Sequence, residues 1–201
     1  MLNEKLVNFC NDNFDDGKLI LDKLFEYKKI LIKENEFMNL IGKSTIDDLD
    51  DRHFLDCIQI VKYLPHYDKS LMDIGTGAGL PGVILSIIGF KNLHLVEKSP
   101  KKSSFLENCK YRLGLNYVVH NKSISEISNL NVDCITARAF ASIEKIISMT
   151  KKIINKKTKF ILHKGKSYLT ELETINTQKY FWVTHPSITS SESKIIIMGI
   201  K

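Results

Sequence analysis

A glycine-rich turn between a short apolar run and a helical pattern constrains this chain more than any other feature. It reads Met72-Asp73-Ile74-Gly75-Thr76-Gly77-Ala78-Gly79-Leu80-Pro81-Gly82. Glycine lets the backbone take positive φ, and it lets a ligand approach backbone atoms that a Cβ would shield. Three alternating glycines are costly unless a ligand needs them, so a merely tight turn is the weaker interpretation. The run predicts a nucleotide-binding turn.

The turn alone fits two classes of cofactor. Gly77, Gly79 and Gly82 spell GxGxxG, the pattern of dinucleotide sites. Glu97 ends the next apolar run, twenty residues after Gly77, and could bind a ribose in a dinucleotide or in S-adenosylmethionine. Two features favour S-adenosylmethionine. Asp73 offers an acceptor to a cationic ammonium but would repel a pyrophosphate, and the chain has no second mononucleotide-binding half.

Short apolar runs alternate with helical patterns from residue 70 onward. This alternation predicts an α/β fold in which parallel strands are joined by right-handed crossovers. The last two runs leave no room for a helix between them, so we expect an antiparallel pair that closes the sheet. The predicted strands are Leu71–Ile74, Leu93–Val96, Tyr117–Val119, Val132–Thr136, Phe160–His163, Tyr180–Thr184 and Ile195–Ile200.

Helical patterns precede and separate these strands. In the second predicted helix, Ser44 and Asp47 resemble a capping box. The last one is capped by Ser99, opens with proline and ends before Gly114. The predicted helices span residues 18–34, 44–64, 81–88 and 100–113.

Length and composition predict one cytoplasmic domain without metal or membrane. A chain of 201 residues suits one domain, which we divide into a helical extension, 1–65, and an α/β core, 66–201. The four cysteines form no CxxC pair and have no histidine nearby at ligand spacing, which argues against disulfides and zinc. No targeting pattern or run of 18 apolar residues is present. The net charge of +6 indicates an anionic partner, although codon bias towards lysine could also produce it.

The segment after the fourth predicted strand should face the transferred group, because ligands of open α/β sheets bind beyond the carboxyl ends of the strands. It reads Ala137-Arg138-Ala139-Phe140-Ala141-Ser142. Enzymes that methylate exocyclic amines carry Asn or Asp followed by Pro-Pro-aromatic here, and this chain has no such acceptor. Its absence fits a nucleophile without a proton, such as guanine N7, which needs no general base. Catalysis would then rest on alignment and on exclusion of water.

Two side chains of this segment are candidates for the site. Arg138 could hold a guanine edge through O6 or touch the cofactor, and Phe140 could stack on a base. The alternatives are a structural ion pair for Arg138 and a core position for Phe140.

Six short motifs carry a resemblance to a known family. They are Asn39-Leu40, Arg52-His53-Phe54-Leu55-Asp56, the glycine-rich run 73–82, Lys101-Lys102, Arg138-Ala139-Phe140-Ala141-Ser142 and Lys164-Gly165. From about residue 18 to its end, the chain resembles the bacterial 16S rRNA guanine-N7 methyltransferase family, called RsmG or GidB. The resemblance implies a class I (Rossmann-like) methyltransferase fold: a mostly parallel seven-stranded sheet with an antiparallel last strand, and an N-terminal helical extension. It also implies S-adenosylmethionine as cofactor and guanine 527 of 16S rRNA as target.

The resemblance implies roles for individual residues as well. Cofactor contacts carry over onto Gly75, Leu80, the pair Ile124-Ser125 and Arg138. They add to Asp73, Gly77 and Gly79 of the turn and to Glu97 at the end of the next predicted strand. Ser125 stands where the family often has an acidic residue, and Ser123 where it usually has arginine. Arg138 is the expected catalytic residue, acting by positioning. The expected RNA contacts are Asn39, Arg52, His53, Lys101, Lys102, Phe140 and Lys164.

The partner implied is 16S rRNA or the small ribosomal subunit, bound by a monomer. For His53, packing or capping within a helix is an equal alternative. For the lysines, an equal alternative is a solvated surface position without any RNA contact. A small nicotinamide-dependent reductase and a non-catalytic RNA-binding factor remain the rival functions.

Overall fold

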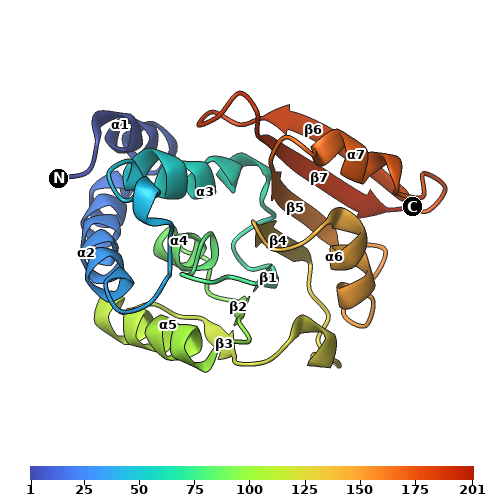
Figure 1. Ribbon diagram of the computed structural model, residues 1–201, viewed down its shortest axis with the longest axis horizontal. Coiled ribbons are helices and arrows are strands. Elements are labelled where there is room, and N and C mark those ends of the chain that lie inside the picture. The colour runs from blue at the N-terminus through green and yellow to red at the C-terminus, as the bar shows by residue number, and fades with distance from the viewer.

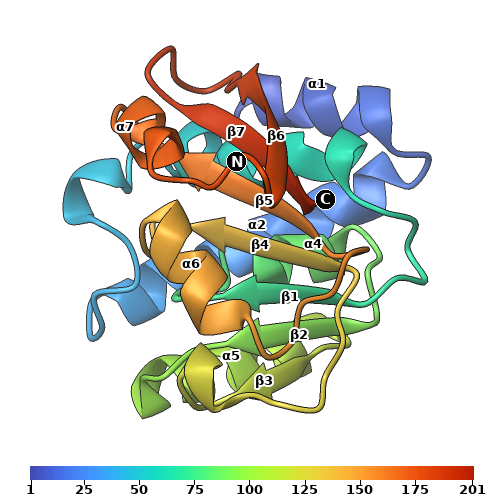
Figure 2. The ribbon, with the colours of Figure 1, turned by 90° about the vertical axis from the view of Figure 1, so that its right-hand side faces the viewer.

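Seven strands form one sheet in the computed structural model, which describes residues 1–201 (Figure 1). Their order is β3-β2-β1-β4-β5-β7-β6 (Figure 2). Strands β1 to β5 run parallel to one another, whereas β7 lies between β5 and β6 and is antiparallel to both. The expected mostly parallel sheet with an antiparallel last strand is confirmed. The strands are β1 (Leu71–Ile74), β2 (Leu93–Val96), β3 (Val118–His120), β4 (Cys134–Arg138), β5 (Lys159–Lys164), β6 (Tyr180–Pro186) and β7 (Lys194–Ile200).

The carboxyl ends of the three central strands lie side by side. Asp73 on β1 is level with Leu95 on β2 and with Thr136 on β4. Strand β4 begins at Cys134 instead of the predicted Val132. Val132 is buried in the loop before β4, and its apolar side chain was therefore wrongly predicted to belong to the strand. The shift makes Arg138 the last residue of β4, at the edge where the central strands end.

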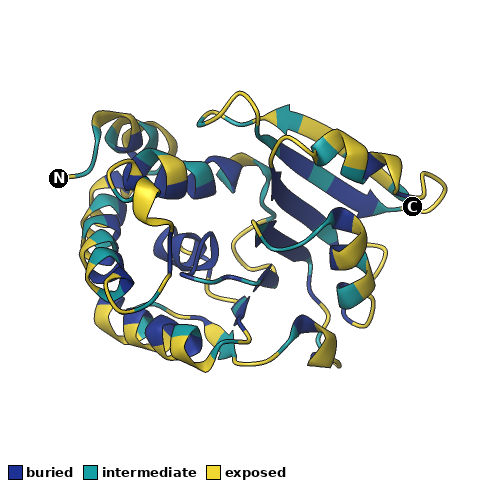
Figure 3. Cartoon of the chain, in the orientation of Figure 1, coloured by how far each residue is buried: buried dark blue, intermediate teal, exposed yellow.

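Helices cover both faces of the sheet. Figure 1 shows α1 to α5 on one side and α6 and α7 on the other. Because strand side chains alternate between faces, Leu71 of β1 packs with the first group, and Met72 and Ile74 pack with the second. Figure 3 shows strands β1, β4 and β5 buried and the outer faces of the helices exposed. The helices are α1 (Glu4–Asn13), α2 (Gly17–Asn35), α3 (Asp56–Ile58), α4 (Gly82–Ile87), α5 (Pro100–Leu113), α6 (Ile143–Thr150) and α7 (Tyr168–Glu173).

Helix α5 follows its sequence signals closely. The Ser99 side chain accepts a hydrogen bond from the Lys102 amide, and Gly114 ends the helix with φ 59°. Its predicted bounds are confirmed. Helices α1, α6 and α7 were not predicted from the sequence.

The predicted helix over residues 44–64 is wrong. Ser44 and Asp47 form no capping box, and the region changes its helical type three times. Leu49 and Phe54 still face the core. The spacing of apolar residues is similar in α-, 3₁₀- and π-helical turns, whose backbone hydrogen bonds span four, three and five residues. The pattern therefore did not reveal the helical type, which explains the error. The segments are the 3₁₀ turns Lys43–Thr45 and Gln59–Tyr63, the π-helical turn Asp50–Leu55, and α3 between the last two.

The helical extension shares its core with the sheet. The larger apolar cluster joins Leu6 and Leu24 of the extension to Val83 and Leu106 of α4 and α5. No helix is both long and apolar enough to cross a membrane. Because the two regions have one continuous core, we expect them to unfold together.

Candidate cofactor-binding site

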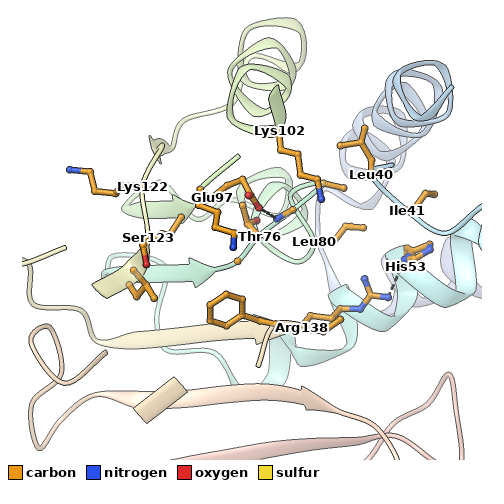
Figure 4. Close-up of a pocket in the computed structure, with 18 of the residues that line it drawn as sticks. Leu40, Ile41, His53, Thr76, Leu80, Glu97, Lys102, Lys122, Ser123 and Arg138 are labelled. Atoms are coloured by element: carbon orange, nitrogen blue, oxygen red, sulfur yellow. Dashed lines mark hydrogen bonds between the residues drawn. The ribbon is translucent and has the colours of Figure 1, made fainter. Parts of the chain in front are cut away.

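A cavity of about 520 Å³ opens at the carboxyl ends of β1, β2 and β4 (Figure 4). Its walls come from segments that are distant in the sequence: the loop 40–42, the glycine-rich turn, the ends of β2 and β4, and residues 122–124. Small-molecule sites usually have volumes of roughly 300–1,000 Å³. The cavity is therefore large enough for a nucleoside-sized ligand.

Two glycines shape the turn at this cavity. A Cβ at Gly77, whose φ is +58°, would have only one neighbour within 4 Å, the Gly75 carbonyl oxygen at 3.9 Å. It would therefore occupy open space that the bare backbone leaves to a ligand. A Cβ at Gly75 would lie 2.0 Å from Cδ2 of Phe140. The Phe140 ring thus packs directly onto the turn, and it lines the cavity as well.

The helical extension is hydrogen-bonded to the glycine-rich turn. The buried Tyr27 hydroxyl donates a hydrogen bond to the Ala78 carbonyl oxygen. At the end of α2, the Asn35 side-chain oxygen accepts hydrogen bonds from the Leu40 and Ile41 amides, each at 2.9 Å. Helix α2 therefore fixes both the glycine-rich turn and the opposite wall.

Glu97 lines the cavity just after β2. Its carboxylate accepts hydrogen bonds from the Gly77 amide at 3.0 Å and the Ser99 amide at 2.8 Å. Each carboxylate oxygen has a further lone pair, so Glu97 can still accept hydrogen bonds from ligand hydroxyls. This fits the predicted ribose contact.

Asp73 lies beneath the cavity instead of lining it. The side chain is fully buried and accepts hydrogen bonds from the Gly82 amide and the Thr136 hydroxyl, both at 2.9 Å. Burial raises the pKa of Asp73 to about 6, a rise that the hydrogen bonds from Thr136 and Gly82 limit. The expected contact with a cofactor ammonium does not fit this position. Asp73 instead fixes the start of α4 against β4.

Arg138 stands between the cavity and the helical extension (Figure 4). Its Nε donates to Asp56 Oδ2 at 2.8 Å, and its Nη2 donates to the Arg52 carbonyl oxygen at 2.7 Å and to His53 Nδ1 at 3.0 Å. These bonds use three of the five guanidinium hydrogens and leave the Nη1 pair free. The ion pair that the sequence left as an alternative is therefore present, and Arg138 also lines the cavity.

His53 is buried at the same wall, with 8% of its surface exposed. Its Nε2 lies 2.7 Å from the Thr45 hydroxyl oxygen. Burial and the neighbouring Arg138 charge lower the pKa of His53 to about 4. The ring is therefore neutral at pH 7 and is not available as a surface contact to RNA.

Three lysines belong to the lining of the cavity. Lys98, Lys102 and Lys122 line it, whereas Lys101 is exposed outside it. Figure 4 labels Lys102 and Lys122. Lys164 differs from the expectation of an RNA contact. Its buried ammonium pairs with Glu171 at 2.7 Å and donates to the Ala141 carbonyl oxygen, because the strand carries it beneath the loop after β4.

Most predicted site residues meet at this cavity, and some do not. Of the predicted residues, the cavity is lined by Gly75, Gly77, Leu80, Glu97, Ile124, Arg138, His53, Lys102 and Phe140. Ser125, Asn39 and Arg52 are outside it, and Gly79 packs on Val83. The sequence reasoning missed Lys122 and Met149, for which no motif gave a signal, and Ile41 and Gly42, which follow the Asn39-Leu40 motif.

No group of three or more His, Cys, Asp and Glu side chains is arranged to hold a metal ion.

The sequence matches the GidB family, described as rRNA small subunit methyltransferase G, over residues 20–195. The chain belongs to the GidB family. The resemblance inferred from the six motifs is confirmed.

Relatives of this GidB-family chain match it over most of its length. Ribosomal RNA small subunit methyltransferase G of Rickettsia rickettsii (strain Sheila Smith) is 37% identical over 180 residues, which cover 88% of this chain and 92% of that protein. The protein of the same name from Orientia tsutsugamushi (strain Boryong) is 33% identical over 200 residues, covering 98% and 99%.

Solved structures of other proteins share the fold of this GidB-family chain. The ribosomal protein L11 methylase from Lactobacillus delbrueckii subsp. bulgaricus has a TM-score of 0.62 at 16% identity, covering 73% of this chain and 77% of that one. A mutant of MtNAS, in complex with S-adenosylmethionine, has a TM-score of 0.61 at 16% identity, covering 98% and 84%. At such identities the likeness shows the fold alone. The Rossmann-like methyltransferase fold expected from the sequence is confirmed.

Proposed function

We propose that this chain transfers a methyl group from S-adenosylmethionine to N7 of a guanine in 16S rRNA, with guanine 527 as the expected target. One observation carries the proposal. The cavity at the carboxyl edge of the sheet combines a bare backbone at Gly77, the carboxylate of Glu97 and the guanidinium of Arg138. Membership of a family described as rRNA small subunit methyltransferases supports it.

The residues present fit S-adenosylmethionine. Glu97 would accept hydrogen bonds from the ribose hydroxyls, and the open backbone at Gly77 would pack against the cofactor. Ile124 would cover the adenine, since it is buried in the turn that closes this end of the cavity. When bound, the cofactor supplies an electrophilic methyl group on a sulfonium. Asp73 would act indirectly, by fixing the turn.

The side chains at the far wall would orient the guanine. The two free Nη1 hydrogens of Arg138 can donate to O6, which lies next to N7 on the same edge of the base. Phe140 can pack on the base or on the cofactor from its position over Gly75. N7 carries a lone pair and no proton, so the absence of a free general base beside Arg138 is compatible with this reaction. The chain's contribution is alignment and exclusion of water.

The lysines suit a polyanionic substrate better than the cofactor alone. Lys98, Lys102 and Lys122 line the cavity, and exposed Lys101 is adjacent to Lys102 in the sequence. S-adenosylmethionine carries a net positive charge, so three lysines beside it need negative charge from another molecule, such as RNA phosphates. We further propose that the protein acts in the cytoplasm as a monomer.

Two measurements test the function. Calorimetric titration should show binding of S-adenosylmethionine and none of NAD(P)H, and the opposite result would favour a reductase. Purified protein should transfer a labelled methyl group to 16S rRNA or small subunits from cells that lack this gene. Mass spectrometry of the product should place the label on N7 of guanine 527. Cofactor binding without any transfer to rRNA would favour the non-catalytic factor.

A further inference from the structure

A directed chain of hydrogen bonds crosses the wall between Arg138 and the loop 40–42. Arg138 Nη2 lies 3.0 Å from His53 Nδ1, and His53 Nε2 lies 2.7 Å from the Thr45 hydroxyl oxygen. The Thr45 hydroxyl donates to the Gly42 carbonyl oxygen at 2.7 Å. Both ends of this chain line the cavity, because Arg138 and Gly42 belong to its walls.

The direction of the chain fixes the protonation of the ring. A guanidinium has donors only, so His53 Nδ1 must accept and must carry no proton. The single ring proton is then on Nε2 and points to Thr45, whose hydroxyl hydrogen is engaged with Gly42. Every donor in the chain meets an acceptor in this one arrangement, the neutral Nε2–H tautomer. A protonated ring would bring a second N–H against the Arg138 cation.

The π-helical turn explains how the ring reaches this place. Residues Asp50–Leu55 are wound more widely than an α-helix, and π-helical turns occur often at functional sites. The same turn directs the Arg52 carbonyl oxygen at Arg138, and Asp56 follows directly with its carboxylate. Three contacts from this short segment therefore hold one guanidinium, and His53 alone connects it to the opposite wall.

We propose that His53 is a positioning residue that, as the neutral Nε2–H tautomer, orients the Arg138 guanidinium and holds the Gly42 loop. This rests on the proposed function, because it takes Arg138 as the group that meets the guanine. It replaces both interpretations of His53 from the sequence, an RNA contact and a histidine that merely packs. His53 is largely buried at the cavity wall, and its proposed effect on the guanine is exerted through Arg138.

Two substitutions separate the two bonds of the ring. In His53→Asn, the side-chain oxygen takes the position of Nδ1 and can still accept from Arg138, while the bond to Thr45 is lost. In His53→Gln, the side-chain amide reaches the position of Nε2 and can donate to Thr45, while Arg138 loses its acceptor. We expect His53→Asn to keep kcat within about threefold and to weaken cofactor binding. We expect His53→Gln to keep cofactor binding and to lower kcat by at least about tenfold, since misalignment of a reacting group carries such losses.

A matched control is His94→Gln. His94 is half-buried on β2, where its Nδ1 is 3.0 Å from His120 Nε2, and it does not line the cavity. This variant should leave both kcat and cofactor binding unchanged. If His53→Asn and His53→Gln lower kcat equally, or if their kcat values follow only their melting temperatures, His53 is a packing residue and the proposal is wrong.

The tautomer can be measured without any activity. Long-range ¹⁵N–¹H NMR of the wild-type protein at pH 7 should show one buried histidine with the proton on Nε2, assigned by its loss in His53→Asn. A proton on Nδ1, or on both nitrogens, would overturn the inference. If the wild-type protein fails to methylate rRNA, the proposed function fails, whereas this NMR result and the side-chain position of Arg138 in a crystal of His53→Gln still decide the role of His53.

Discussion

At the scale of single residues, Asp73 is a buried carboxylate whose bonds leave it a structural role. It accepts from the Gly82 amide and the Thr136 hydroxyl. In Asp73→Asn, the amide oxygen can accept from Gly82 while the amide group donates to the rotatable Thr136 hydroxyl. In Asp73→Ala, the buried Gly82 amide loses its partner, a cost of about 1–3 kcal/mol. We expect calorimetry to find near-normal cofactor affinity in Asp73→Asn and weaker affinity in Asp73→Ala.

The contrast between these two variants is informative because they differ in shape and share the loss of charge. If Asp73 met the cofactor ammonium through its charge, both substitutions should weaken binding to a similar degree. Equal losses would therefore restore the direct contact that the sequence suggested.

The protonation of His53 predicts a pH dependence of stability. Its pKa falls from an ordinary value of 6.5 to about 4 in the folded protein, first through burial and then through Arg138. Between these values the unfolded chain binds the proton more tightly, so this contribution to stability is present above pH 6.5 and is lost as the pH falls towards 4. Relative to His53→Asn, the free energy of unfolding of the wild type should fall by about 2 kcal/mol between pH 7 and pH 5.

Urea denaturation of both proteins at the two pH values measures this difference. Other titrating groups are common to the two proteins, so their effects largely cancel. Parallel pH profiles would show that the folded ring titrates near its ordinary pKa, and would count against the buried neutral state.

At the scale of elements, α2 acts on the glycine-rich turn through one hydroxyl. Tyr27 donates to the Ala78 carbonyl oxygen in the glycine-rich turn. Tyr27→Phe leaves this buried oxygen without a donor, which should cost about 1–3 kcal/mol of stability and loosen the turn. We expect weaker cofactor binding by calorimetry together with a lower melting temperature.

Tyr117→Phe is the matched control for this change. The Tyr117 hydroxyl is also buried and donates to a backbone carbonyl oxygen, that of Leu106 on α5, at 2.7 Å. It lies outside the cavity. It should lower stability to a similar degree and leave cofactor affinity unchanged. An equal loss of affinity in both variants would mean that α2 has no special effect on the turn.

The elements also show how far the sequence could be interpreted. Helix α5 was predictable because Ser99, Pro100 and Gly114 act locally. The π-helical turn was not, because apolar spacing does not reveal helical type and its contact with Arg138 joins residues more than eighty positions apart in the sequence. The glycine-rich turn located the cavity because its signal is local. The partners of Asp73 and Lys164 come from other strands and helices, so the sequence did not reveal what these two side chains contact.

At the scale of the whole molecule, the lysines are on one edge of the sheet and can be compared with lysines elsewhere. Lys102→Gln with Lys122→Gln removes two cations from the cavity rim. If both meet phosphates, RNA affinity should fall, and the slope of log K against log salt should become shallower by about 0.7–0.9 per lysine. Filter binding to 16S rRNA fragments at several salt concentrations measures the slope.

The control pair for this comparison is Lys23→Gln with Lys91→Gln. Both lysines border a separate hollow between α2 and the end of α4. Because the net charge changes equally in the two double variants, a general effect of charge would alter their slopes alike. Identical slopes would show that RNA does not approach the cavity edge.

The position of β7 also determines how the protein tolerates truncation. Strand β6 has only one neighbour in the sheet, and that neighbour is β7. A chain that stops just before residue 194 would lack β7, which leaves β6 without a partner and the outer edge of β5 unpaired. The unpaired edge of β5 would be open to self-association, and buried residues such as Phe160 and Ile161 would lose cover. Deletion of β7 alone should therefore abolish folding of the whole protein.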